Sequence, residues 1–274
     1  MTTRTRPERK LATGPVGCAY NSHLQKGGAL LEDMRLLVRN WQNTNAHGQQ
    51  DAVVAENLLG KRTRARATDT LRYAFLPRFV NGRPPQAWEI VRKLEDRHLP
   101  LEILRPVYYW ITARSERLLY DFVCSELFRC SKNQAQSIKT DEVCGWISSQ
   151  LARCGKSWSQ TVTTKVAQGV LATLRDFCIL EGTIKKRIAP VYLPVESFAY
   201  IAFALHQEGV SGPNLVYHHD WSLFLFSPLV VEHMFLEADR HAFLRFQAAG
   251  KIIRIDFPVQ GFEEMADVVA ARSH

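Results

Sequence analysis

The sequence predicts a mainly α protein: a helical bundle with two helix-turn-helix or winged-helix-like elements and a small C-terminal β-hairpin. Apolar residues recur at helical spacing through most of the 274 residues, and glycine or proline separates the periodic runs. One pair of segments near the C-terminus has the pattern of two strands around a turn. Hydrophobic residues make up 46% of the chain and charged residues 23%, which is enough to build a sizeable core.

The first half of the chain is expected to consist of helices. Five apolar runs have helical spacing, at residues 30–41, 50–59, 63–79, 88–94 and 100–128. Gly60 ends the second run, and Thr63 is the expected N-cap of the third. The run that follows Pro100 is long and rich in apolar residues, so we expect it to be the central core helix.

The second half is expected to combine helices with extended segments. Helices are predicted at residues 141–153, 159–180, 198–206 and 229–240. Residues 183–191 are predicted to be extended and basic. A β-hairpin is predicted from strands at 243–246 and 252–257, which flank a turn at Ala249-Gly250.

These elements divide the chain into four expected parts. The parts are a flexible basic N-terminus at 1–20, an N-terminal helical domain with the first helix-turn-helix at 21–130, a winged-helix-like second helix-turn-helix at 131–194, and a C-terminal helical extension with the β-hairpin at 195–274. Residues 131–140 are polar, which is typical of a connection between two units.

The charge balance is basic. The chain has 35 Lys and Arg residues against 27 Asp and Glu residues, a formal net charge of +8. This balance favours a polyanionic partner, but the placement of the charges carries more information than their sum. Two segments gather basic or hydroxyl side chains on a helix that follows a short turn, and both predict contact with double-stranded DNA.

The first segment covers residues 50–78, where two helices flank a turn at 60–62 in the layout of a helix-turn-helix. The turn and second helix carry six cations against one acid, Asp69, and helical geometry places Asp69 and Tyr73 on the side expected to face solvent. Arginines on such a helix suit base edges or phosphates in a major groove, whereas a solvated basic face is the alternative. The expected DNA contacts here are Lys61, Arg62, Arg64, Arg66, Arg72 and Arg78.

The second segment covers residues 141–191, where a helix, a short turn and a longer helix precede the extended basic stretch. This order predicts a winged helix, with the basic stretch as its wing. Hydroxyl and amide side chains beside free backbone N–H groups at a helix N-terminus suit phosphate contact, whereas simple capping is the alternative. The expected DNA contacts here are Ser157, Ser159, Gln160, Thr161, Thr164, Lys165, Lys185, Lys186 and Arg187.

Motifs for catalysis or metal binding are weak. The tripeptide at 155–157 imitates the end of a phosphate-binding loop, but Gln150 stands where that loop has glycine, and no strand is predicted before it. His218-His219-Asp220 has no further His or Cys at metal-ligand spacing, and no acid–base pair stands out. We therefore expect no enzymatic activity, no cofactor and no metal ion.

The sequence also indicates a cellular location. It contains no run of about 18 uncharged apolar residues, and no apolar segment follows its basic N-terminus. None of its six cysteines forms a C-x-x-C pair, so we expect reduced thiols. These features predict a cytoplasmic protein that does not enter a membrane.

Several short stretches are distinctive in their order and spacing. They are GGALLE at 27–32, VAENLLGKRT at 54–63, LLYDF at 118–122, WSQT at 158–161 and LRDFCIL at 174–180. Together they resemble the BrxA family of bacteriophage-exclusion (BREX) systems over roughly residues 20–190. The resemblance implies a mainly helical fold with two helix-turn-helix elements, double-stranded DNA binding, no catalytic activity, and partnership with other phage-exclusion proteins.

The chain departs from this family pattern at residues 195–274, which extend beyond compact members. We expect a partner-docking or wing-like hairpin module there. Two other functions remain open from the residues. One is a protein-interaction scaffold of the defence complex, whose basic faces meet acidic partners. The other is an RNA-binding helical protein that resembles an antitermination factor.

Overall fold

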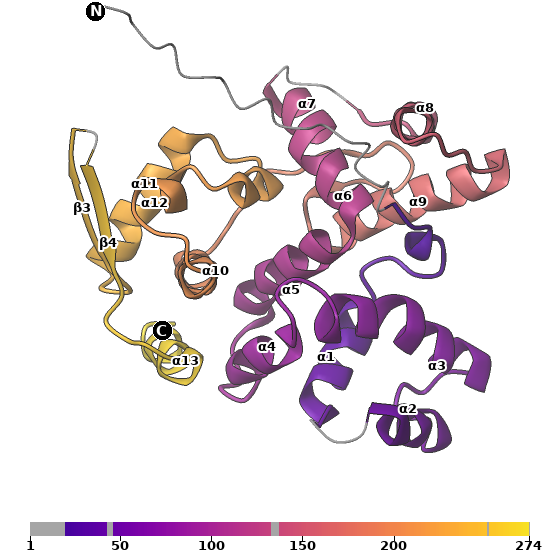
Figure 1. Ribbon diagram of the computed structural model, residues 1–274, viewed down its shortest axis with the longest axis horizontal. Coiled ribbons are helices and arrows are strands. Elements are labelled where there is room, and N and C mark those ends of the chain that lie inside the picture. The colour runs from indigo at the N-terminus through magenta and orange to yellow at the C-terminus, as the bar shows by residue number, and fades with distance from the viewer. Residues whose placement is uncertain (1–19, 43–45, 133–136, 251, 274) are drawn as a thin grey trace, which may run out of the picture.

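A computed structural model of the chain describes residues 20–42, 46–132, 137–250 and 252–273. The described part is mainly helical with two short antiparallel strand pairs, which confirms the predicted fold class (Figure 1). Residues 1–19, the bulk of the predicted basic arm, lie outside the described residues. Within the described ranges, no helix combines the length and apolar character needed to cross a membrane.

The N-terminal helices form largely where the apolar spacing predicts them. They are α1 (Leu31–Asn40), α2 (Ala46–Ala55), α3 (Arg64–Thr70), η2 (Leu71–Val80) and α4 (Ala87–Glu95). α3 and η2 are one continuous helical run, and its second part has π-helical hydrogen bonding. Pro77 lies inside that part, where it lacks the N–H that a regular α-helix would use.

The central core helix is shorter than predicted. α5 (Leu101–Ser115) ends before Glu116, and the chain continues as α6 (Arg117–Asp121), η3 (Phe122–Leu127) and α7 (Phe128–Lys132). The prediction of one helix to residue 128 is therefore wrong. Glu116 leaves the helical conformation, with φ −104° and ψ 85°, and its buried carboxylate accepts a hydrogen bond from Arg78. This buried ion pair holds the chain at the break.

A helix pair and a two-stranded ribbon follow. They are α8 (Thr140–Arg153), α9 (Gln160–Asp176), β1 (Leu180–Glu181) and β2 (Arg187–Ile188). α9 ends before the predicted residue 180 because Cys178 adopts a left-handed conformation, with φ 61°. Ile179 N then donates to Leu174 O at 2.8 Å, a hydrogen bond typical of helix C-terminal caps.

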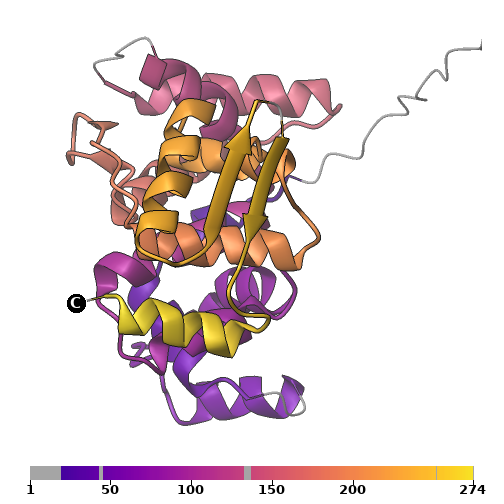
Figure 2. The same cartoon turned by 90° about the vertical axis from the view of Figure 1, so that its left-hand side faces the viewer.

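The C-terminal part contains the predicted hairpin and more helix than predicted. Its elements are α10 (Val195–Gln207), α11 (Pro213–Val216), η4 (His219–Phe224), α12 (Pro228–Arg240), β3 (Arg245–Ala249), β4 (Ile252–Asp256) and α13 (Phe262–Ala271). The hairpin pairs Phe246 with Ile255, whose side chains are both buried, and it lies over α12 and α10 (Figure 2). The sequence prediction missed α13, α11 and η4, as well as the short η1 (His23–Gln25) near the N-terminus.

One contiguous apolar core runs through all these parts. α5 lies at its centre, where Leu104 is fully buried, and α10 packs against it. Ser197 Oγ donates to Ile103 O at 2.7 Å, and Tyr200 OH donates to Ile90 O at 2.8 Å. The C-terminal extension therefore shares the core of the N-terminal helices, while the predicted domain boundaries stay predictions.

Candidate nucleic-acid interface

The first basic element is built from α2, a tight connection and α3. The connection turns at Asn57 and Gly60, which both have positive φ, and Gly60 N donates to Asn57 O at 2.8 Å. Thr63 is the N-cap of α3, as predicted, since its Oγ1 accepts from Arg66 N at 3.3 Å. Val53 on α2 and Ala67 on α3 are buried, so the two helices pack through their apolar faces.

Four of the predicted arginines lie exposed on this element. They are Arg62, Arg64, Arg66 and Arg72. In the part of the chain that the structure describes, no acidic side chain forms an ion pair with any of them. Exposed arginines without such partners keep their full charge and donors for an anionic ligand. Four of the six predicted contacts of this element are therefore exposed cations.

Asp69 and Tyr73 are partly buried, because the segment before α1 packs on them. Lys26 forms an ion pair with Asp69 at 3.2 Å and lies over the Tyr73 ring, 5.6 Å from its centroid. The His23 ring also packs against Tyr73, with centroids 5.4 Å apart. The segment around η1 thus covers this part of the helix. Because Lys26 offsets the only acid between residues 61 and 78, the cationic character of the element is preserved.

Arg78 is not a DNA contact, and this prediction is wrong. Its side chain is fully buried, where Nε donates to Glu116 at 2.9 Å and Nη1 donates to Gly28 O at 2.9 Å. The physical reason is its position three residues after Phe75, which puts it on the buried stripe of the helix. Lys61 is partly exposed, but its Nζ lies 2.7 Å from Asp33, which offsets its charge.

A groove of about 530 Å³ separates α2 from the α3–η2 run. Arg64, Thr68 and Arg72 line one wall, and Gln50 and Asp51 line the other. Arg64 and Arg72 are eight residues apart, so they occupy the same side of the run, about two turns apart. Two of the four exposed arginines therefore border a groove, and a ligand that fills it would meet both.

The second basic element is built from α8 and α9, which pack closely on each other. Ser159 is the N-cap of α9, since its Oγ accepts from Val162 N at 3.4 Å. Val166 and Val170 are fully buried, which places the valine stripe in the core as predicted. The predicted side chains exposed at the start of α9 are Ser157, Ser159, Gln160, Thr161 and Lys165. Thr164 is half-buried and lies 3.5 Å from the Gln160 amide nitrogen.

The predicted wing is the β1–β2 ribbon. Gly182 turns with φ +88°, and a Cβ at this position would lie 2.2 Å from Lys185 O, so the tight turn requires glycine. Ile138 N donates to Lys186 O at 2.7 Å, which adds a bridge from the segment before α8. Lys185 is exposed at the tip, whereas Arg187 forms an ion pair with Glu181 across the ribbon.

The two elements lie on the same side of the molecule. Figure 1 shows α3 and α9 on the right and the β3–β4 hairpin on the opposite side. The segment around η1 packs between them, because it contacts both α9 and η2. A Cβ at Gly169 of α9 would lie 2.2 Å from Leu24 O, so this contact is close. Lys26 and Gly28 also join this segment to the α3–η2 run, through the ion pair with Asp69 and the hydrogen bond from Arg78.

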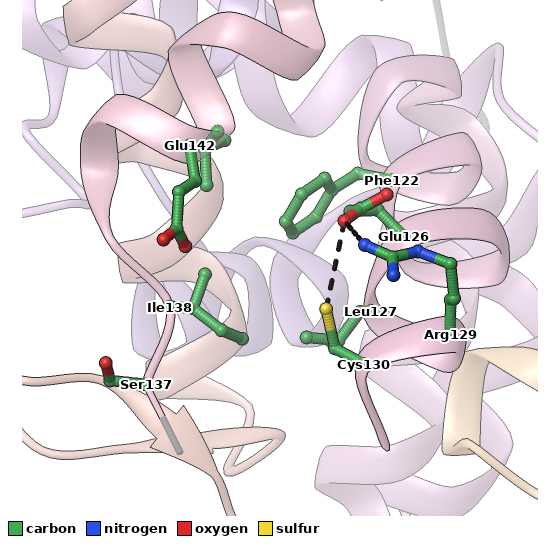
Figure 3. A pocket seen from close by; sticks show the side chains of 9 residues that line it. Phe122, Glu126, Leu127, Arg129, Cys130, Ser137, Ile138 and Glu142 are labelled. Atoms are coloured by element: carbon green, nitrogen blue, oxygen red, sulfur yellow. Dashed lines mark hydrogen bonds and ion pairs between the residues drawn. The ribbon is translucent and has the colours of Figure 1, made fainter. Parts of the chain in front are cut away.

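A cavity of about 340 Å³ lies behind the second element, between α8 and the η3–α7 run (Figure 3). Glu142 and Ile138 form one wall, and Glu126, Cys130 and Phe122 form the other. Burial and the Glu126 carboxylate raise the pKa of the Cys130 thiol, so it stays protonated near neutral pH. Its lining has two carboxylates, and its lining cation, Arg129, forms an ion pair with Glu126, so this cavity does not suit a phosphate group.

Sequence reasoning missed the linking role of residues 20–28. The signal available was the positive charge of Lys26, but its partners Asp69 and Tyr73 lie more than 40 residues away in the chain. Contacts at that separation are set by the tertiary fold, not by local periodicity. Among the described residues, no group of three or more His, Cys, Asp or Glu side chains has the placement of a metal site.

These features define a mainly helical protein with two basic helix pairs on one side. A family model for BrxA matches residues 18–204, which include both pairs. The chain belongs to the BrxA family and is therefore a component of a BREX phage-defence system. No curated protein matches the chain significantly.

Proposed function

We propose that this BREX component is a non-catalytic protein that binds double-stranded DNA through its two basic elements. The observation that carries the proposal is the group of exposed arginines on α3 and η2 with no acidic partner among the described residues. Arginine is the residue best suited to bidentate contact with phosphates and with guanine in the major groove. Partnership with other defence proteins accompanies this role.

The first element supports this proposal as a helix-turn-helix. α3 begins at a capped N-terminus immediately after the turn, and Arg62, Arg64 and Arg66 lie at that end. In helix-turn-helix proteins, the N-terminal residues of the second helix contact base edges. Arg72 lies further along the run and would contact the phosphate backbone beside the groove.

The second element supports the proposal as a winged helix-turn-helix. The order of a bridge at Ile138, α8, α9 and the β1–β2 ribbon is the order that a winged helix requires. The exposed hydroxyl and amide groups lie at the N-terminus of α9, where the helix dipole favours a phosphate. Lys165 on α9 and Lys185 on the ribbon add positive charge.

A fluorescence-anisotropy titration with labelled duplex DNA, duplex RNA and single strands tests the proposal. We expect duplex DNA to bind most tightly, and the combined substitution Arg62→Ala, Arg66→Ala and Arg72→Ala to weaken it at least about tenfold. No binding of duplex DNA at micromolar protein and low salt would refute the proposal. Stronger binding of RNA would favour the antitermination-like alternative instead.

A protein-interaction scaffold is the second function that a specific observation favours. Leu229 on α12 and Ile252 on β4 are 76% and 75% exposed, and these two elements lie away from α3 and α9 (Figure 1). Large apolar side chains exposed in this way favour contact with another protein. Copurification with the other components of the defence system tests this function. A scaffold alone predicts copurification together with DNA affinity no better than that of an unrelated basic protein.

A further inference from the structure

A polar cleft of about 790 Å³ lies apart from the two basic elements. Five parts of the chain line it: Tyr20 before η1, the loop after η2, the junction of α5 and α6, the end of α8, and the start of η4. The residues that the inference uses are Tyr20, Arg83, Arg117, Tyr120, His219 and Asp220. None of the exposed arginines of the first element lines it. Its volume falls in the range typical of sites for small organic ligands.

Asp220 organises the floor of this cleft. It is 3% exposed and accepts hydrogen bonds from Trp110 Nε1 and Tyr120 OH, each at 2.8 Å. Arg114 Nε lies 3.1 Å from the same carboxylate. A buried carboxylate with this many donors is compensated and held in one position. The floor is therefore rigid, and Asp220 does not present a bare negative charge to a ligand.

The hydrogen-bond pattern also fixes His219. Burial and the Asp220 charge raise the pKa of Tyr120, which keeps its hydroxyl protonated. Since that hydroxyl donates to Asp220, its oxygen accepts from His219 Nδ1, which lies 3.0 Å away. The His219 ring stacks on Tyr120, with centroids 5.7 Å apart and planes 27° apart. His219 is itself exposed, so a rigid stacked pair borders the cleft.

Two arginines lie at the rim, one without an acidic partner among the described residues and one that forms an ion pair. Arg83 is exposed, and in the described ranges no acidic side chain forms an ion pair with it. Its backbone is held in place, because Arg83 N donates to Ser115 Oγ at 3.1 Å. Arg117 is 57% exposed and shares Asp121 with Tyr20, whose hydroxyl also donates to that carboxylate at 2.8 Å.

We propose that this cleft binds a nucleotide, with its phosphate on Arg83 and Arg117 and its base against the exposed ring of His219. Guanidinium groups bind phosphate oxygens through charge-assisted hydrogen bonds, and an aromatic ring held by stacking is a platform for a base. The rigid Asp220 network holds both parts in place. This site goes beyond the proposed DNA binding and does not depend on it.

Isothermal titration of the full chain with ATP, AMP and inorganic phosphate tests the site. We expect ATP and AMP to bind with dissociation constants below about 1 mM. Arg83→Ala should weaken both nucleotides about tenfold, which is the loss of one charge-assisted contact. His219→Ala should weaken AMP but leave the affinity for inorganic phosphate unchanged. Arg254→Ala, which removes an exposed arginine of β4, is the control and should change neither.

Three results would overturn the nucleotide site. They are the absence of heat with ATP and AMP at millimolar concentration, equal affinity for AMP and inorganic phosphate, and an affinity that Arg83→Ala does not alter. A parallel titration with duplex DNA separates the two sources of phosphate. We expect Arg83→Ala to leave DNA affinity unchanged. If Arg83→Ala lowers the affinity for duplex DNA and no nucleotide binds, the cleft binds the phosphates of nucleic acid. The nucleotide site is then refuted, and the DNA-binding proposal stands.

Discussion

Glu95 at the end of α4 is a buried carboxylate that joins three elements. Arg35 Nε lies 2.8 Å from it, Tyr108 OH donates to it at 2.9 Å, and Arg39 forms a further ion pair. Burial opposes ionisation of Glu95, but the hydrogen bonds from Arg35, Arg39 and Tyr108 outweigh it and lower the pKa of the carboxyl below its ordinary value near 4.5. The charged form of Glu95 therefore stabilises the fold.

This lowered pKa predicts a pH dependence of stability. Because the carboxyl is more acidic in the folded than in the unfolded state, its contribution is complete above its ordinary pKa and is lost as the pH falls through the folded pKa. We expect the free energy of unfolding to fall below about pH 4.5, and Glu95→Gln to flatten that fall. Urea denaturation of both proteins across this range measures it. An equal pH dependence in the variant would contradict the assignment.

Arg78 gives a second prediction at the level of single residues. Arg78→Ala leaves the Glu116 carboxylate buried without its partner, so we expect a loss of about 3–5 kcal/mol in the free energy of unfolding. Under conditions where the variant stays folded, the salt dependence of DNA binding should not change, because Arg78 contacts no phosphate. A stability loss well below this range, with a shallower salt dependence, would mean that Arg78 contacts DNA after all.

At the scale of elements, two glycines of the second helix pair have opposite surroundings. Gly145 lies exposed within α8, where a Cβ would meet nothing within 4 Å. Gly169 lies in α9 against the Leu24 carbonyl, only 2.2 Å from the position of a Cβ. The first is an ordinary helix glycine, and the second allows the linking segment to approach.

These surroundings predict effects of opposite sign. Gly145→Ala should stabilise the protein by about 0.5–1 kcal/mol, because alanine loses less backbone freedom in a helix. Gly169→Ala should destabilise it by about 1–3 kcal/mol, because the backbone of the linking segment must move. Chemical denaturation of the two variants provides the comparison. A stabilising Gly169→Ala would show that η1 does not pack on α9 in this way.

Much of the element structure could be predicted from the sequence, and the errors have separate causes. The valine stripe of α9 and the hairpin turn at 249–250 follow from local patterns, which are the helical spacing of apolar residues and a turn between two strand-like runs. The break at Glu116 depends on Arg78, 38 residues away, so no local pattern shows it. α13 has helical apolar spacing of its own, with Met265, Ala266 and Val269 buried, so this helix could have been predicted from the sequence.

The same distinction applies to the candidate site. Exposure of Arg62 and Arg66 followed from their places opposite the apolar stripe. Arg78 could have been excluded on the same grounds, because it continues the stripe formed by Leu71 and Phe75. The pairing of Lys61, in the connection before α3, with Asp33 of α1 could not be foreseen from spacing.

At the scale of the whole molecule, the two basic elements and the C-terminal hairpin lie on opposite sides (Figure 1). The exposed arginines of α3 and the polar start of α9 lie on one side, with the segment 20–28 packed between them. The exposed apolar side chains of α12 and β4 lie on the other side. Exposed arginines suit a polyanion, and the exposed apolar side chains of α12 and β4 suit contact with another protein, which agrees with the proposed function.

The salt dependence of duplex DNA affinity tests the central proposal most directly. We compare the wild type with the variant Arg62→Ala, Arg66→Ala and Arg72→Ala, and with a charge-matched control. The control is Arg240→Ala, Arg245→Ala and Arg254→Ala, which removes three exposed arginines of α12, β3 and β4, elements that lie opposite α3 and α9 in Figure 1.

We expect the logarithm of the wild-type binding constant to fall linearly with the logarithm of salt concentration, by about 0.9 per phosphate contact. The first variant should bind DNA more weakly, and its slope should be shallower by the equivalent of up to about three phosphate contacts. The control should keep nearly the wild-type slope. Equal losses in the two variants would mean that net charge alone attracts DNA. That result would contradict a DNA-binding site on α3 and η2.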